Sequence, residues 1–144
     1  MELNPDAIEY FKAFESFTGV MPLDMIEARG SLFFIIPQER IGLVLAGKGK
    51  KIESLKLKID RNIYVVADAE DPLQFAKNLF NNVRILETTD ENIMGETVLY
   101  LIVDEKDKSK VLGKNRARLD GARELMKSKF GISLFVKTRL PPPM

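Results

Sequence analysis

The hydrophobic and polar positions of this sequence predict one series of elements that occurs twice: helix, strand, strand, helix, helix and strand. In the first series, an apolar stripe from Ile8 to Phe17 predicts a helix that begins at Asn4-Pro5 and ends at Gly19. The later apolar runs predict strands at 23–29, 31–36 and 59–66 and helices at 38–45 and 50–57. This mixture of short helices and strands is typical of an α+β fold.

The second series begins at Asp71-Pro72, where an N-cap aspartate precedes a proline at the first helical position. Its pattern predicts helices at 73–80, at 107–112 and after residue 116, and strands at 83–86, 97–103 and 132–136. Thr88 to Gly95 is predicted to be a polar turn. The end of the chain, from Arg139 through the tail 141–144, is predicted to be disordered.

The two series are related by a constant offset of 67 residues (71 − 4, 98 − 31, 113 − 46). The offset links Asn4-Pro5 to Asp71-Pro72, and the apolar strand that starts at Ser31 to the one that starts at Val98. One spacing shared by separate features is the signature of an internal duplication. We therefore predict two homologous domains, at 1–68 and 69–140, followed by the tail.

A short loop rich in glycine and basic residues lies between the two middle helices of each half. The first loop is Ala46-Gly47-Lys48-Gly49 and is followed by Lys50 and Lys51; the second loop is Gly113-Lys114-Asn115-Arg116 and is followed by Arg118. The first turn of a helix has N–H groups without intrahelical partners and carries a partial positive charge. Bases beside such an end make a site where a phosphate can bind.

Charge is unevenly placed along a chain whose formal net charge is only +1. Six bases against one acid, Asp107, lie between Lys106 and Arg118, whereas the first helix is mostly acidic. A basic patch on a nearly neutral protein favours a specific polyanion site over general attraction to polyanions.

The composition also excludes several classes of function. With neither cysteine nor histidine, the chain has no disulfides, no thiolate metal sites and no imidazole base. No apolar run approaches the ~18 residues of a membrane span, and the N-terminus has no signal-peptide pattern. We therefore expect a cytoplasmic binding protein that is not an enzyme, has no cofactor and no membrane partner, and is a monomer.

A Gly-x-x-Gly loop between two short helices that pack on a three-stranded sheet resembles the KH RNA-binding domain. The helix and strand that precede this core resemble the type II arrangement, αββααβ, with helices covering one face of the sheet. Two such units in tandem are similar to the archaeal NusA-like transcription termination and antitermination factors, over nearly the whole chain. The resemblance implies an archaeal transcription regulator that binds single-stranded RNA, namely nascent transcript, with RNA polymerase as a second partner.

The resemblance also implies which residues bind RNA. The loops would clamp the RNA backbone, and the groove beside each loop would take about four nucleotides. The clamp would consist of Ala46, Gly47, Lys48, Gly49, Lys50 and Lys51, and of Gly113, Lys114, Asn115, Arg116 and Arg118. The groove walls would consist of Val44, Ile52 and Leu55, and of Val111, Leu119 and Ala122.

Both loops depart from the family pattern, which leaves a second interpretation open. Ala46 and Arg116 each stand where the family has a glycine, the residue that allows a positive φ and close approach of a phosphate. Arg116 can instead grip phosphate through its guanidinium. The alternative is a protein-interaction scaffold with degenerate loops that docks on RNA polymerase or another partner. A nucleotide-binding P-loop is disfavoured because Gly49 stands where Mg²⁺ requires a hydroxyl.

Overall fold

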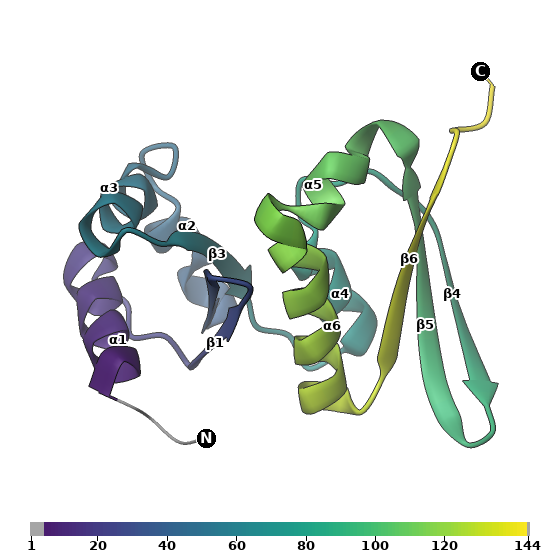
Figure 1. The fold of residues 1–144 in the computed structure, drawn as a ribbon, viewed down its shortest axis with the longest axis horizontal. Helices are drawn as coiled ribbons and strands as arrows, with labels where there is room; N and C mark the ends of the chain where they lie inside the picture. Colours follow the sequence, from purple (N-terminus) through teal and green to yellow (C-terminus); the bar gives the residue numbers. More distant parts are fainter. Residues whose placement is uncertain (1–4, 144) are drawn as a thin grey trace. The chain divides into compact units, whose positions relative to one another are not determined.

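The structure is a computed structural model that describes residues 5–143 (Figure 1). It comprises two compact units, Met1–Glu70 and Asp71–Met144. The N-cap predicted at Asn4 lies outside the described residues. Among the described residues, no helix is both long and apolar enough to cross a membrane.

The first unit contains three helices and three strands, together with one short 3-10 turn. They are α1 (Pro5–Thr18), β1 (Asp24–Ala28), β2 (Ser31–Ile36), η1 (Gln38–Arg40), α2 (Ile41–Val44), α3 (Lys50–Ile59) and β3 (Asn62–Ala67). The sheet has the order β1-β2-β3, with β1 antiparallel and β3 parallel to the central strand. A helix must lie between β2 and β3, because parallel neighbours require a crossover connection.

The second unit repeats this order. It contains α4 (Pro72–Leu79), β4 (Ile85–Ile93), β5 (Glu96–Asp104), η2 (Glu105–Asp107), α5 (Lys108–Leu112), η3 (Lys114–Arg116), α6 (Ala117–Phe130) and β6 (Ser133–Arg139). Its sheet has the order β4-β5-β6, again antiparallel and then parallel. The predicted α+β fold with two three-stranded sheets is therefore confirmed. The first residues of α1 and α4, of α3 and α6, and the 31–36 and 98–103 strand segments all keep the 67-residue offset (72 − 5, 117 − 50).

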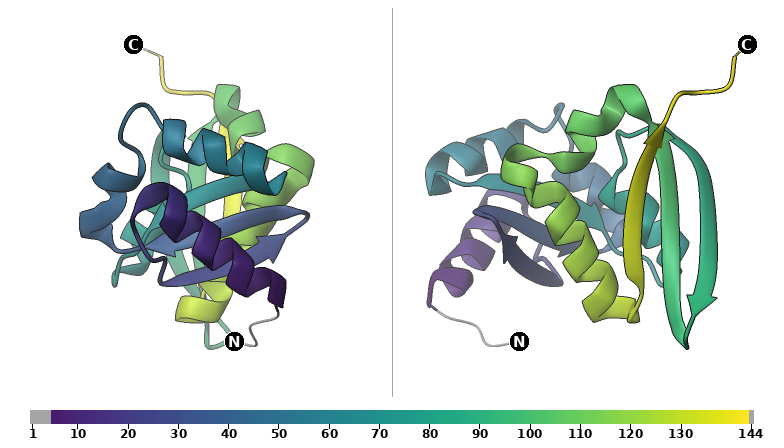
Figure 2. Two further views of the ribbon diagram at one scale, coloured as in Figure 1. Left: turned by 90° about the vertical axis from the view of Figure 1, so that its left-hand side faces the viewer. Right: turned by 45° about the vertical axis from the view of Figure 1, so that its right-hand side comes forward.

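The core of the first unit lies between the sheet and the helices α1 and α3, which lie side by side (Figure 2, left). The ring of Phe14 stacks on that of Phe34, with centroids 4.4 Å apart. The face of α1 differs slightly from the prediction, because Ile8 is exposed and Ala7 is buried in its place. The buried stripe therefore follows Ala7, Phe14 and the polar Thr18, which a period of 3.6 residues brings to one side.

The prediction of a polar turn from Thr88 to Gly95 is wrong. Thr88 belongs to β4, which pairs with β5 as far as Ile93, and the chain reverses only at Met94-Gly95. Both residues have positive φ, 52° and 84°, as a two-residue hairpin turn requires. The polar side chains of β4 fit its place at the edge of the sheet, where most of them are exposed. The segment is a strand because its backbone forms hydrogen bonds with β5, which the pattern of side chains does not reveal.

Two other boundaries differ from the sequence prediction. Ile59 was assigned to a strand but ends helix α3, which is closed by Asp60 in the left-handed conformation at φ 53°. Arg139 was placed in the disordered end of the chain but pairs with Asp104 as the last residue of β6. Helix α6 has 14 residues against 10 in α3. The difference is about one helical turn. As a result, β6 begins later in the sequence than a 67-residue offset from β3 would place it.

Candidate nucleic-acid interface

Each loop ends with one residue in the left-handed conformation immediately before a helix. Gly49, the N-cap of α3, has φ 77° and ψ 17°. Arg116, the N-cap of α6, has φ 65° and ψ 13°. The preceding residues also match, because Lys48 and Asn115 have φ 60° and 56°. The backbone of the second loop therefore keeps the conformation that a glycine would adopt, although an arginine occupies the position.

The leading positions of the two loops differ. Gly113 has φ 70° and ψ −176°, a conformation that is essentially restricted to glycine. Ala46 is not among the residues with positive φ, and the first loop reverses through Gly47 instead, at φ 68°. Alanine is therefore compatible with the first loop, whereas the second loop requires the glycine that it has kept.

We expect the Arg116→Gly variant to be about 1 kcal/mol more stable than the native chain, and Gly49→Ala to be about 1 kcal/mol less stable. A side chain in the left-handed region is strained, and a Cβ placed on Gly49 would meet no atom within 4 Å. Urea denaturation followed by circular dichroism measures both changes. Equal stability of Gly49→Ala and the native chain would show that position 49 accepts an alanine side chain without backbone strain.

The N-cap residues of α3 and α6 make no side-chain cap to the helix. The first N–H of each helix is bonded within the turn, that of Lys50 to the carbonyl of Gly47 at 3.3 Å and that of Ala117 to the carbonyl of Lys114, so the N–H groups that follow it are the uncapped ones. Lys48 and Lys50 are exposed beside the first terminus, and Lys114 is exposed beside the second. Lys51 is half-buried and donates to the carbonyl of Leu43 at 3.3 Å, which ties α3 to α2. Uncapped N–H groups beside lysines give the N-terminus of α3 and the N-terminus of α6 a positive electrostatic potential.

Arg116 is shared between the second loop and helix α6. Its Nε lies 3.4 Å from a carboxylate oxygen of Asp120 one turn later, and its side chain is 54% exposed. An exposed ion pair of this kind contributes only about 0.5 kcal/mol. A phosphate can therefore compete with Asp120 for the guanidinium.

The structure corrects the prediction that Arg118 binds RNA phosphate. The residue is only 7% exposed. Its guanidinium donates to the carbonyls of Leu79 and Lys110, at 3.1 Å each, and to the amide oxygens of Asn81 and Asn82. It also lies 5.4 Å from the centre of the Phe80 ring. The carbonyls of Leu79 and Lys110 are near the ends of α4 and α5, where intrahelical partners are missing. Arg118 therefore joins three helices.

The basic run at 106–118 is also smaller than the sequence indicated, because two of its lysines face buried acids. Lys106 lies 3.9 Å from Asp104, and Lys110 lies 3.4 Å from Asp107. Asp107 accepts a hydrogen bond from the N–H of Arg84 at 2.8 Å, which holds the pKa of its carboxyl below the ordinary value. The exposed bases of the run that face no buried acid are therefore Lys108, ahead of the loop, and Lys114 and Arg116 in the loop.

A hollow of about 400 Å³ lies between α6 and β6. It is lined by Asp120, Arg123, Glu124, Lys127, Ser133, Leu134 and Phe135. β6 is an edge strand, so one side of its backbone has no strand partner within the described sheet. Sequence reasoning missed Arg123 and Phe135. Phe135 could have been found as an apolar residue two positions after the start of the last strand, and Arg123 as a base about two helical turns after the loop.

The predicted groove walls are mostly core residues. Val44, Leu55 and Ala122 have no exposed surface, and Ile52 and Val111 are 6% and 4% exposed. Leu119 is half-buried. Side chains that point toward the sheet cannot contact a ligand, so the lining of the hollow replaces them as the candidate groove in the second unit.

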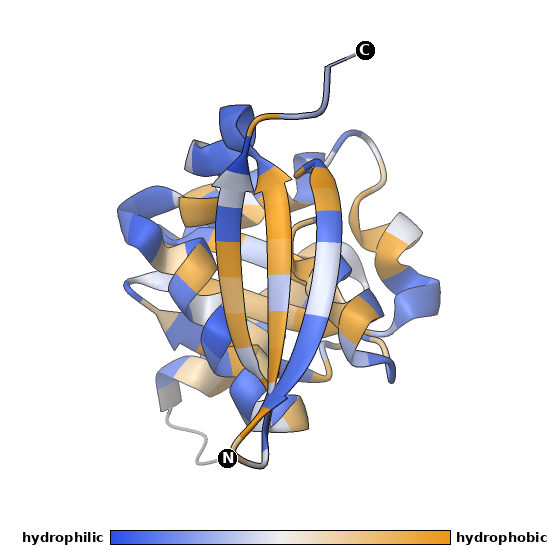
Figure 3. Ribbon diagram, turned by 90° about the vertical axis from the view of Figure 1, so that its right-hand side faces the viewer, coloured by the Kyte–Doolittle hydropathy of each residue, from blue (hydrophilic) through white to orange (hydrophobic). Residues whose placement is uncertain are grey.

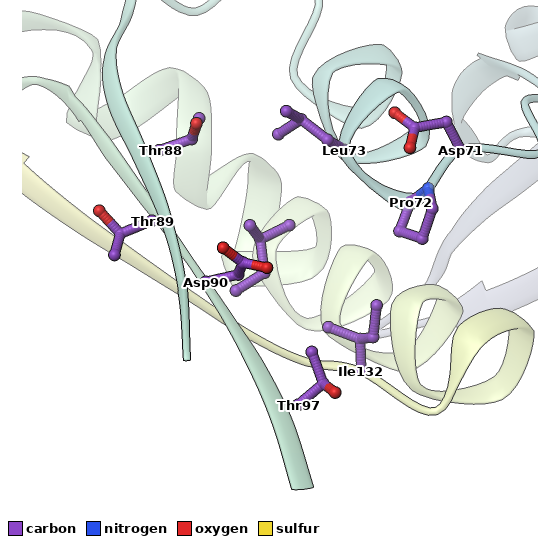
Figure 4. Close-up of a pocket in the computed structure, with 9 residues that line it drawn as sticks. Asp71, Pro72, Leu73, Thr88, Thr89, Asp90, Thr97 and Ile132 are labelled. Carbon is purple, nitrogen blue, oxygen red and sulfur yellow. The ribbon is translucent and has the colours of Figure 1, made fainter. Parts of the chain in front are cut away.

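A second concavity of about 400 Å³ lies between the start of α4 and the β4–β5 hairpin (Figure 4). Asp71 and Asp90 line it, together with threonines and apolar side chains such as Leu99 and Ile132. Two carboxylates without a base in the lining repel phosphate. Among the described residues, no group of three or more acids could hold a metal ion that would neutralise them. RNA backbone is therefore excluded from this concavity.

Comparison with known proteins gives relatives of low identity that extend over most of the chain. A search against models of protein families finds no match. A protein of Methanococcus vannielii described as "Probable transcription termination protein NusA" is 22% identical over 125 residues, which are 87% of this chain and 72% of that protein. A protein of Halobacterium salinarum with the same description is 23% identical over 133 residues, or 92% and 94% of the two chains.

A solved structure is similar as well. The crystal structure of APE1850 covers 95% of this chain and 100% of its own, with a TM-score of 0.72 and 27% sequence identity. The relatives support a NusA-like family at most, and the solved structure supports a shared fold with two three-stranded sheets and their helices.

Proposed function

We propose that this chain is a NusA-like transcription termination and antitermination factor that binds single-stranded RNA through two tandem type II KH domains. The observation that carries the proposal is the repeated turn: Gly49 and Arg116 have the same left-handed conformation before an uncapped helix, with exposed bases beside it. The relatives described as NusA add support for a role in transcription.

The type II arrangement is part of the proposal. In each unit a helix and an antiparallel strand precede the two strands that are joined through the loop-bearing helices, and these two strands are parallel. This order agrees with αββααβ and places the loop at one end of the parallel pair.

In the proposed mechanism the protein holds RNA without chemistry. The N–H groups at the starts of α3 and α6 bind phosphate oxygens, and Lys48, Lys50, Lys114 and Arg116 neutralise further phosphates. In the second unit, bases enter the hollow between α6 and β6. There the exposed backbone edge of β6 can read their donors and acceptors, as KH domains do for about four nucleotides.

The remaining parts of the proposal concern the cellular setting. We infer nascent transcript as the RNA, RNA polymerase as a second partner and an archaeal cytoplasm as the location. We further infer a monomer that needs neither a cofactor nor catalytic residues. The four bases around the two loops support RNA over the alternative, a degenerate scaffold, because a scaffold has no need of them.

The proposal predicts a strong salt dependence of RNA affinity. We expect an unstructured 12-nucleotide RNA to bind with a log K that falls linearly with log salt, with a slope of about −3 for four phosphates neutralised. Fluorescence anisotropy across a potassium chloride series measures the slope. A hairpin RNA of the same length serves as the control and should bind more weakly, because its bases are paired.

Two results would contradict the proposal. Absence of binding to any single-stranded RNA at low salt would leave the scaffold as the better interpretation. Equal affinity for the single strand and the hairpin would show that the bases do not enter a groove.

A further inference from the structure

The outer face of the second sheet carries two stacked aromatic rings. Tyr100 of β5 and Phe135 of β6 are direct neighbours in the strand register, with ring centroids 5.7 Å apart and planes 26° from parallel. We name these two residues the aromatic platform. Phe135 is 41% exposed, a large fraction for a phenylalanine, and Tyr100 is half-buried.

No helix described in the second unit covers this face. Leu99, Leu101 and Leu134 are buried and point toward the helices, so alternation along the strands places Tyr100 and Phe135 on the opposite side. Figure 3 looks onto that side and shows the three strands in front of the helices. By the same alternation Ile102 of the central strand also lies on the outer face, where it is half-buried.

The platform is a repeated feature. Phe33 of β2 and Tyr64 of β3 are also register partners, with ring centroids 4.9 Å apart and planes 26° from parallel. Phe33 stands 67 residues before Tyr100 (100 − 33). Phe33 is 1% exposed, however, whereas Phe135 in the second unit remains open. The duplicated pair is therefore available to a ligand only in the second unit.

The platform is continuous with the candidate groove, because Phe135 belongs to both. It lines the hollow between α6 and β6, and it stacks on Tyr100 across the outer face. A strand of RNA that leaves the hollow over the edge strand therefore reaches the platform directly.

The charges around the platform favour a nucleic acid over an apolar protein surface. The Arg123 guanidinium lies 5.2 Å from the centre of the Phe135 ring, and the Lys137 ammonium lies 5.1 Å from that of Tyr100. Arg139 lies further along β6 and pairs with Glu87 at 2.9 Å. Two further acids share this face by alternation, Glu91 of β4 and Glu96 of β5, and Glu96 pairs with Lys127. Aromatic rings flanked by cations form the usual stacking surface for single-stranded RNA.

We propose that the aromatic platform is a second RNA contact, where one or two bases that follow those in the groove stack on Phe135 and Tyr100. Arg123 and Lys137 neutralise the adjacent phosphates. The proposal rests on the proposed function and extends it, because the platform lies outside the loops and the groove that the family resemblance implies.

The first test is photo-crosslinking of the native chain to a ten-nucleotide RNA that carries 5-iodouridine at single positions. This base crosslinks to aromatic rings stacked on it, and mass spectrometry of the digested complex identifies the residue. We expect crosslinks at Tyr100, the platform residue that lies outside the hollow, from one end of the RNA. Crosslinks confined to the loops and the hollow, from every labelled position, would overturn the platform and leave the proposed function intact.

The second test compares RNAs of two lengths in an anisotropy assay. The Tyr100→Val/Phe135→Val variant keeps β-branched residues on the strands and removes both rings. We expect it to bind the ten-mer about tenfold more weakly than the native chain, because stacking adds affinity for each base. A four-mer, which the groove alone accommodates, should bind the Tyr100→Val single variant and the native chain equally, because Tyr100 does not line the hollow. Thr89→Val, on the same face and opposite Tyr100, is the matched control and should change neither affinity.

The outcomes separate the two proposals. Unchanged ten-mer affinity in the double variant overturns the platform, and binding of the four-mer then still supports the groove. Absence of binding to either RNA by the native chain overturns both. Self-association of the native chain that the double variant loses, without a crosslink to the rings, would identify the platform as a protein interface and overturn the proposal.

Discussion

Replacing Arg118 by methionine is expected to lower the free energy of unfolding of the second unit by about 3 kcal/mol. Methionine fills part of the volume but leaves the carbonyls of Leu79 and Lys110 without their donor. A buried acceptor without a partner costs about 1–3 kcal/mol. Arg118→Lys should recover only part of the loss, because one ammonium cannot replace the planar set of donors.

Urea denaturation measures the total effect, and hydrogen exchange with mass spectrometry locates it to the peptides of α4, α5 and α6. Arg123→Met on the same helix is the matched control, because Arg123 is exposed and its loss should cost less than about 0.5 kcal/mol. Under conditions where Arg118→Met remains folded, its RNA affinity should stay within about threefold of native. A stable variant with strongly reduced RNA affinity would instead restore Arg118 to the RNA site.

The combined variant Lys48→Glu/Lys50→Glu/Lys114→Glu/Arg116→Gln is expected to lose RNA affinity on the order of 100-fold at low salt, because its phosphate contacts are removed or reversed. Glutamine is chosen at 116 because a glutamate there would face Asp120. Each loop should also be tested alone. The share of the loss assigned to each loop then shows whether both units bind RNA.

Fluorescence anisotropy with the 12-nucleotide RNA measures this loss, and the salt slope should become less negative by about 0.7 for each phosphate contact removed. Lys12→Glu/Lys77→Glu is the control, because it reverses two exposed charges on α1 and α4, which belong to neither loop. A comparable loss of affinity in the control would show that the overall charge of the protein, and not the loops, determines binding.

The contrast between Arg116 and Arg118 shows the limit of inference from charge runs. Both residues belong to the same basic segment and flank Ala117, so sequence spacing alone assigns them similar roles. The helix that starts between them turns Arg118 toward α4, while Arg116 remains in the loop. Two residues along a helix rotate a side chain by about 200°, which separates a surface position from a buried one.

Much of the fold could be predicted because local pattern and burial agree. The six-residue apolar run at Ser31–Ile36 is a fully buried strand, as its unbroken hydrophobicity predicts. Asp71-Pro72 begins a helix, because the Asp71 side chain accepts from the N–H of Gln74 and the proline needs no donor. The constant offset located the two loops, since duplicated segments place the same turn at the same point of each unit.

The sequence by itself determined the two-unit α+β organisation, the position of both loops and the bases beside them. These depend on short-range preferences: hydrophobic period, caps and glycine. Only the tertiary structure decided that Arg118 is enclosed by α4, α5 and α6, that polar Thr88 lies in a strand paired with β5, and that Tyr100 meets Phe135 on an open sheet face. Each of these facts depends on contacts between residues eight or more positions apart, and the free energy of those contacts is not encoded in any local pattern.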